Sequence, residues 1–75
     1  MISEKEVRAV IAEAVPGIDA SKIALDTSLF DAGVDSLDHT NILLGLQEQH
    51  QLVVPDEEAD KLKSIQDILD YARRK

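Results

Sequence analysis

Cysteine and tryptophan are absent from the 75 residues, and Phe30 and Tyr71 are the only phenyl-type aromatic side chains. Without cysteine the chain can form neither a disulfide nor a thiolate metal site, so apolar packing must hold the fold together. With so few aromatics, the core must consist of Leu, Ile, Val and Ala, which favours helices over a β-sandwich or a barrel.

Long apolar runs are also missing, because no stretch approaches the roughly 18 residues that span a bilayer. The first residues lack the basic start and apolar segment of a signal peptide, so we expect a cytoplasmic protein. A chain of this length has room for one core. We therefore expect a single domain over residues 1–75, a free-standing monomer that is too small to enclose a catalytic cleft.

Positive charge is missing from the middle of the chain. Residues 23–60 contain nine Asp and Glu and no Lys or Arg, and the whole chain has a net charge of −7. Phosphate contacts require clustered Lys and Arg, so nucleic acid is excluded as a partner. Two interpretations remain: a surface kept soluble by repulsion, or a field that steers basic partner proteins toward the molecule.

The first helix is predicted by local signals. Ser3 and Glu6 have the spacing of a capping box, and Pro16-Gly17 ends the apolar periodicity. The irregular residues up to Asp35 predict a long loop with a short helical turn near residues 19–23. Apolar side chains should pin this loop to the core; they are Ile18, Ile23, Leu25, Leu29 and Phe30.

A second helix is predicted from Asp35 or Ser36 to about His50, with apolar residues in two stripes about 140° apart. One stripe holds Ile42, Leu43 and Leu46, and the other holds Leu37, Thr40 and Leu44. Either the second stripe is exposed as a docking strip, or both stripes are buried because the helix is central.

Two further helices complete the pattern. Pro55 at a first helical position, followed by three acidic residues, predicts a brief third helix that ends near Leu62. Ser64 should cap a fourth helix whose C-terminal end carries the cations of Arg73, Arg74 and Lys75. The predicted fold class is all-α: a small four-helix bundle of three main helices and one short helix, with a long loop between helices 1 and 2.

Ser36 lies where the long loop becomes the second helix. Asp35 can cap that helix, which would release the Ser36 hydroxyl to point outward, and Asp38 lies on the same first turn. Gly33 should permit a tight approach of the chain. A phosphodiester on the serine oxygen would lie near the unpaired N–H groups of the first turn, which tolerate negative charge.

This pattern resembles that of the acyl carrier proteins over roughly residues 3–72. The matching pieces are Leu29-Phe30-x-x-Gly33 before Asp35-Ser36-Leu37-Asp38, the run 54–59 (Val-Pro-Asp-Glu-Glu-Ala), and the spacing between them. The resemblance implies that a separate phosphopantetheinyl transferase attaches 4′-phosphopantetheine to Ser36, and that the arm carries acyl or related cargo as a thioester. It also implies docking on basic patches of acyl-transferring or synthase enzymes through Asp35, Leu37, Asp38, Leu44, Glu48 and Asp56.

Some residues depart from the family's pattern. Fatty-acid carriers have glutamates where this chain has Asn41, Gln47 and Gln49, and an aromatic residue where it has His50. This predicts a specialised carrier, with lipid A, secondary-metabolite and aminoacyl cargo all open beside fatty acyl groups. His39 and His50 either pack at the core margin with one ring nitrogen in water, or form a polar edge that alters which cargo is sheltered.

Metal binding and intrinsic catalysis are not expected. The two histidines are not spaced as a ligand pair, and Asp31, Asp35 and Asp38 do not follow the alternation of a calcium loop. His39 is the only candidate base for Ser36, and no third group orients it. The rival to a carrier is a helical interaction module that takes no prosthetic group and binds a partner through its acidic face.

Overall fold

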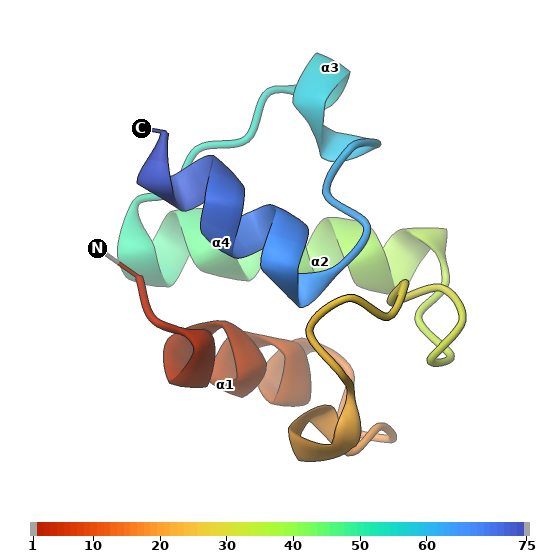
Figure 1. The fold of residues 1–75 in the computed structure, drawn as a ribbon. Coiled ribbons are helices and arrows are strands. Elements are labelled where there is room, and N and C mark those ends of the chain that lie inside the picture. Colours follow the sequence, from red (N-terminus) through yellow and green to blue (C-terminus); the bar gives the residue numbers. More distant parts are fainter. Residues whose placement is uncertain (1, 75) are drawn as a thin grey trace.

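The computed structural model describes residues 2–74, which form helices and loops without a strand (Figure 1). The elements in order are α1 (Glu4–Ala14), a short 3₁₀ helix η1 (Ala20–Lys22), α2 (Ser36–His50), α3 (Asp56–Ala59) and α4 (Ile65–Arg73). α1 packs against α2, α4 and η1, whereas α3 stands at the edge of the molecule. The predicted all-α fold is confirmed.

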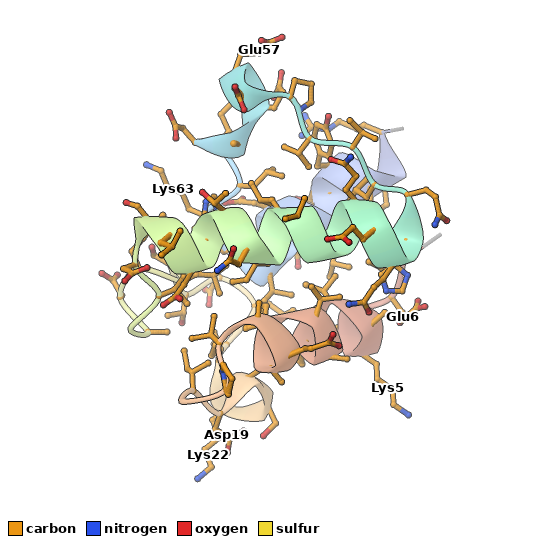
Figure 2. The ribbon with its side chains drawn as sticks, turned by 180° about the vertical axis from the view of Figure 1, so that it is seen from behind. Lys5, Glu6, Asp19, Lys22, Glu57 and Lys63 are labelled. Carbon is orange, nitrogen blue, oxygen red and sulfur yellow. The ribbon has the colours of Figure 1, made fainter. Side chains whose placement is uncertain are left out.

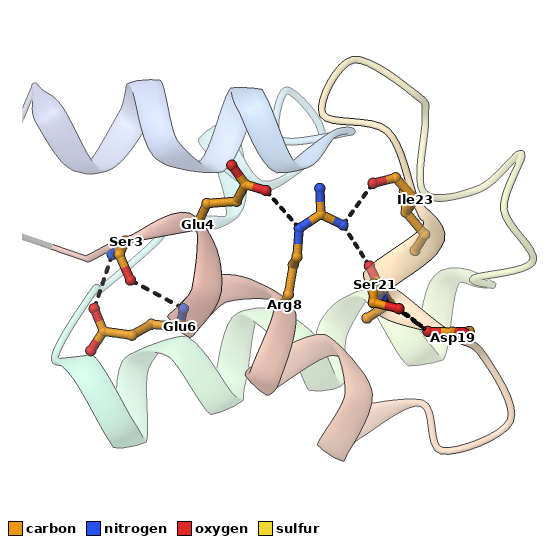
Figure 3. A network of polar contacts seen from close by, with 8 residues as sticks. Ser3, Glu4, Glu6, Arg8, Asp19, Ser21 and Ile23 are labelled. Carbon is orange, nitrogen blue, oxygen red and sulfur yellow. Dashed lines mark hydrogen bonds and ion pairs between the residues drawn. The ribbon is translucent and has the colours of Figure 1, made fainter.

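α1 begins with the predicted capping box. The Ser3 N–H donates to Glu6 Oε1 at 2.9 Å, and the Glu6 N–H donates to Ser3 Oγ at 3.2 Å (Figure 3). The helix ends at Ala14, before Pro16, and the Val15 N–H donates to the Ile11 carbonyl at 2.8 Å.

The capping box predicts a pH dependence of stability. Hydrogen bonds from the backbone and then the side chain of Ser3 lower the pKa of Glu6 below its ordinary value of 4.5. A group with a depressed folded-state pKa stabilises the fold fully above the unfolded pKa, and this contribution is lost as pH falls through the folded pKa. We expect urea unfolding to show a steeper loss of stability below about pH 4.5 for the unaltered protein than for Glu6→Gln. Parallel curves for the two proteins would contradict this assignment.

The loop before α2 is held by a partly buried arginine contact that the sequence pattern did not predict. Arg8 Nη1 donates to the carbonyl oxygens of Ala20 at 2.6 Å and Ile23 at 2.7 Å, while its Nε donates to Glu4 Oε2 at 2.9 Å (Figure 3). Hydrogen bonds from a charged donor are stronger than neutral ones. One side chain of α1 therefore fixes both ends of η1.

The apolar side chains of the loop behave as predicted, with one exception. Ile23 and Leu29 are buried, and Ile18 and Leu25 pack partly buried against the core. Phe30 is 41% exposed, so the expectation that it pins the loop to the core is wrong. Its neighbour Leu29 is fully buried, and the Leu29 N–H donates to the Lys63 carbonyl at 2.7 Å.

Gly33 serves a different purpose from the predicted one. A Cβ atom at this position would meet no heavy atom within 4 Å, so no close approach requires glycine. Its φ is +106°, a conformation that side-chain-bearing residues rarely adopt. This turn lets the Val34 N–H donate to the Leu29 carbonyl at 3.0 Å and sets the direction of entry into α2.

The two stripes of α2 have different environments. Ile42 and Leu46 are fully buried and Leu43 is partly buried, whereas Leu37 is 70% exposed and Leu44 is 48% exposed. The alternative in which both stripes are buried is therefore wrong. α2 packs on α1 with one face and leaves the other open.

α1 and α2 approach each other closely at Gly45. A Cβ atom there would lie 2.9 Å from Cγ1 of Val10, a fully buried side chain with no flexible end. We expect Gly45→Ala to destabilise the protein, because overpacking costs about 1–3 kcal/mol and exceeds the gain of up to about 1 kcal/mol in helix propensity. Urea unfolding tests this, with Gly17→Ala as control because a Cβ at Gly17 meets nothing. A more stable Gly45→Ala protein would contradict the argument.

The third and fourth helices differ from the prediction in detail. Pro55 is the N-cap of α3 and not its first helical residue, and α3 ends at Ala59, short of Leu62. The chain leaves the helix because Leu62 turns into the core and Lys63 bonds Leu29. Ser64 caps α4 as predicted and forms a reciprocal pair with Asp67. Arg73 and Arg74 lie at the end of α4, and Lys75 lies outside the described residues.

Candidate functional site

Ser36 is the first residue of α2, and its side chain is exposed. Asp35 is the N-cap: its Oδ1 accepts from the Asp38 N–H at 2.8 Å, and its carbonyl accepts from the His39 N–H at 2.9 Å. Capping is therefore done by Asp35, as predicted. Within residues 2–74, the Ser36 hydroxyl makes no hydrogen bond, so it is accessible to another protein.

The backbone around Ser36 suits a negatively charged substituent. The N–H groups of Ser36 and Leu37 have no acceptor among the described residues, as expected at the start of a helix. These groups lie at the positive end of the helix dipole. The first turn can therefore accommodate a phosphodiester on Ser36 without losing an existing contact.

A groove of about 330 Å³ runs from Ser36 between α2 and α3. Its lining mixes apolar and polar side chains from both helices, the preceding loop and residue 54: Phe30, Ser36, His39, Thr40, Leu43, Leu44, Gln47, Val54, Asp56, Ala59 and Asp60. Only Ser36, Leu44 and Asp56 of this set were predicted as site residues. Phe30 could have been found from sequence, because an aromatic is rare in this chain and it lies close to the serine.

His39 is buried more deeply than predicted. It is 7% exposed, and its Nε2 lies 2.7 Å from the Leu62 carbonyl oxygen. Because a carbonyl only accepts, Nε2 carries the proton and donates. The ring also stacks at a 40° tilt against Phe30, with centroids 5.1 Å apart. His50 lies at the core margin as predicted, with Nδ1 3.6 Å from Glu6 Oε2.

The predicted docking residues lie mostly around one face. Leu37, Leu44 and Glu48 fall on a common exposed stripe of α2 that also includes Asn41, since their spacing is close to whole helical turns. Asp35 is exposed at the N-terminal end of this stripe, and Asp56 lies across the groove at the start of α3. Asp38 is partly buried and lies about 100° around the helix from Leu37, so it faces away from the stripe.

Negative charge surrounds this face. Asp56 and Glu57 are exposed on α3, and Glu57 projects away from the body of the molecule (Figure 2). The nearest cations along the chain are Lys61 and Lys63, in the segment between α3 and α4, and Lys61 Nζ lies 3.9 Å from Glu58 Oε2. Between residues 23 and 60 all charged side chains other than histidine are acidic.

Within residues 2–74, no helix combines the length and the apolar character needed to cross a bilayer. No three or more His, Asp or Glu side chains in that part of the chain are grouped so that they could hold a metal ion.

Comparison with known proteins gives a consistent result. A family model described as the phosphopantetheine attachment site matches residues 5–72. An acyl carrier protein of Clostridium acetobutylicum is 39% identical over 74 residues, covering 97% of this chain and 94% of the relative. Acyl carrier proteins of Bdellovibrio bacteriovorus and Thermosynechococcus vestitus are each 36% identical, covering 100% and 95% of this chain and 96% and 88% of those relatives.

Proposed function

Because this chain belongs to the acyl carrier proteins, which use 4′-phosphopantetheine and are not enzymes, we propose that Ser36 receives the arm. The observation that carries the proposal is the exposed Ser36 hydroxyl, which Asp35 releases by capping α2. We further propose that the protein acts as a cytoplasmic monomer in fatty-acid, lipid or secondary-metabolite biosynthesis. Asn41, Gln47 and Gln49 support a specialised set of client enzymes, because they leave the face of α2 less acidic.

Attachment requires a phosphopantetheinyl transferase. Ser36 Oγ attacks the pantetheine-side phosphorus of coenzyme A, a new P–O bond forms, and adenosine 3′,5′-bisphosphate leaves. The transferase takes the hydroxyl proton, because no side chain within residues 2–74 accepts a hydrogen bond from the Ser36 hydroxyl. The bound arm supplies the thiol that holds cargo as a thioester. The unpaired N–H groups of Ser36 and Leu37 stabilise the negative charge of the phosphodiester.

The groove beside Ser36 supports a role in sheltering cargo. Phe30, Leu43, Leu44 and Val54 provide apolar surface within it. Burying an acyl chain against this surface removes apolar area from water, which contributes about 25 cal/mol per Å². A sheltered chain is also kept from water and unrelated enzymes until a client protein docks.

The proposal is tested by mass spectrometry. The protein is incubated with coenzyme A and a phosphopantetheinyl transferase of broad specificity, and the intact mass is measured before and after. We expect a gain of one arm, which fragmentation places on Ser36. An unchanged mass would favour the rival function, a helical interaction module without a prosthetic group.

Docking should depend on charge. The exposed acids beside Leu37 and Leu44 support orientation of basic patches on clients, with exposed leucines adding apolar contact. We expect Glu48→Lys to weaken binding to the transferase about five- to thirtyfold at low salt, since the lost acid and the added cation together cost about 1–2 kcal/mol at up to about 1 kcal/mol for each exposed charge. Surface plasmon resonance measures this, and the difference should shrink as salt screens the charges.

Asp26→Lys is the matched control for this experiment. Asp26 is exposed in the loop, has no ion pair or side-chain hydrogen bond within residues 2–74, and gives the same change of net charge. Its substitution should leave binding nearly unchanged. Equal weakening by both substitutions, or binding that is insensitive to salt, would refute a localised docking face.

A further inference from the structure

We propose, on the basis of the carrier function above, that His39 limits the length of acyl chain that the groove shelters. It does so by a hydrogen bond that joins α2 to the segment after α3. The position of the ring is the first observation. His39 lies one helical turn after Ser36 on the same helix, and its nearly buried side chain forms part of the groove wall. It therefore lies inside the groove close to the point where the arm is attached.

The second observation is what the His39 ring holds. Within residues 2–74, its bond to the Leu62 carbonyl is the only hydrogen bond that joins α2 to residues 55–63. α3 itself is four residues long and contributes no buried residue. Packing alone would hold α3 loosely over α2. The bond between His39 and Leu62 therefore fixes the width of the groove on the side nearest the core, which we call its inner wall.

The third observation is the penalty for opening that wall. Leu62 is 2% exposed and His39 is 7% exposed, so both bonding groups are away from water. A hydrocarbon chain that moved between them would leave a buried donor and a buried acceptor without partners, and it could replace neither. The Phe30 ring, stacked on His39, adds a second fixed group to the same wall. Short acyl chains fit in the groove without disturbing this wall, whereas long acyl chains must break the hydrogen bond between His39 and Leu62.

The groove volume sets the expected limit. A volume of about 330 Å³ holds roughly ten groups the size of a methylene, if each takes about the 30 Å³ of a liquid water molecule. The groove is open along one side, so some of this space stays with solvent. We therefore expect sheltering to increase with chain length up to about eight to ten carbon atoms.

The experiment loads Ser36 from acyl-coenzyme A thioesters of even chain length, from butanoyl to tetradecanoyl, and measures Tm for each acyl form against its own unacylated form. In the unaltered protein, the rise in Tm should stop increasing near octanoyl or decanoyl. In His39→Val it should continue to chains about two to four carbon atoms longer. His39→Gln should behave like the unaltered protein, because its amide N–H can still donate to Leu62.

The rise in Tm on acylation, compared across chain lengths, distinguishes this proposal from a merely structural role of His39. If His39 only stabilises the fold, His39→Val lowers Tm of the acylated and unacylated forms equally, the length profile stays unchanged, and the proposal is overturned. If His39→Val does not fold, His39→Asn gives the same comparison, since its side chain is too short to reach Leu62. Failure of Ser36 to accept any arm would instead overturn the carrier function itself, and the intact mass shows which has failed.

Discussion

Replacing Ser36 with alanine is expected to give a folded protein that gains no arm from coenzyme A in the presence of the transferase. The loss of arm attachment should be complete, because the Ser36 oxygen is the atom proposed to bond phosphorus. Stability should change by about 0.5 kcal/mol or less, since the hydroxyl makes no hydrogen bond within residues 2–74 and is exposed. Intact mass and urea unfolding measure the two effects on the same sample.

Ser21→Ala is the matched control. Ser21 is also an exposed serine, in the short helix η1, and its hydroxyl donates to Asp19. This variant should load as completely as the unaltered protein. An arm on the Ser36→Ala protein would place the attachment site elsewhere, and an unfolded Ser36→Ala protein would show that the hydroxyl is structural.

Replacing Leu46 with alanine should have the largest effect on stability. The Leu46 side chain is fully buried among the core residues. Leu→Ala substitutions at such sites cost about 2–5 kcal/mol through lost burial and the cavity that remains. A protein of this size has a total stability of about 4–11 kcal/mol. Urea unfolding at neutral pH should therefore show a loss of about a fifth or more of the free energy of unfolding.

Leu44→Ala is the contrasting variant on the same helix. Leu44 is 48% exposed and lines the groove, so its truncation should cost about 1 kcal/mol or less in stability. Its effect should appear instead as weaker binding to client enzymes. Similar losses of stability from Leu44→Ala and Leu46→Ala would mean that α2 is buried on both faces in solution, which would remove the docking face.

Helix starts could be predicted because their signals are local. Ser3 with Glu6 and Ser64 are recognisable from three-residue spacing, and their hydrogen bonds close within the same turn. Asp35 follows the same logic at the start of α2. The free hydroxyl of Ser36 was expected from that cap, because Asp35 takes the capping role and leaves the serine oxygen without that contact.

Other features depended on residues far apart in the chain. The Leu29 N–H bonds the Lys63 carbonyl beyond the end of α3, and the buried His39 ring bonds the Leu62 carbonyl. Neither partner could be identified from spacing, since hydrogen bonds of this kind leave no periodic pattern. The need for glycine at position 45 could not be predicted either, because a Cβ atom there would meet the Val10 side chain of another helix.

The amino-acid sequence by itself determined the three main helices, the caps at their N-termini and the acidic middle of the chain, because propensity, capping and charge act over a few residues. Tertiary structure alone decided which stripe of α2 faces water, where the groove lies and what closes its inner wall. Those features depend on contacts between segments more than twenty residues apart. Which side chains are buried in a close-packed interior is decided only when those segments come together in the complete fold.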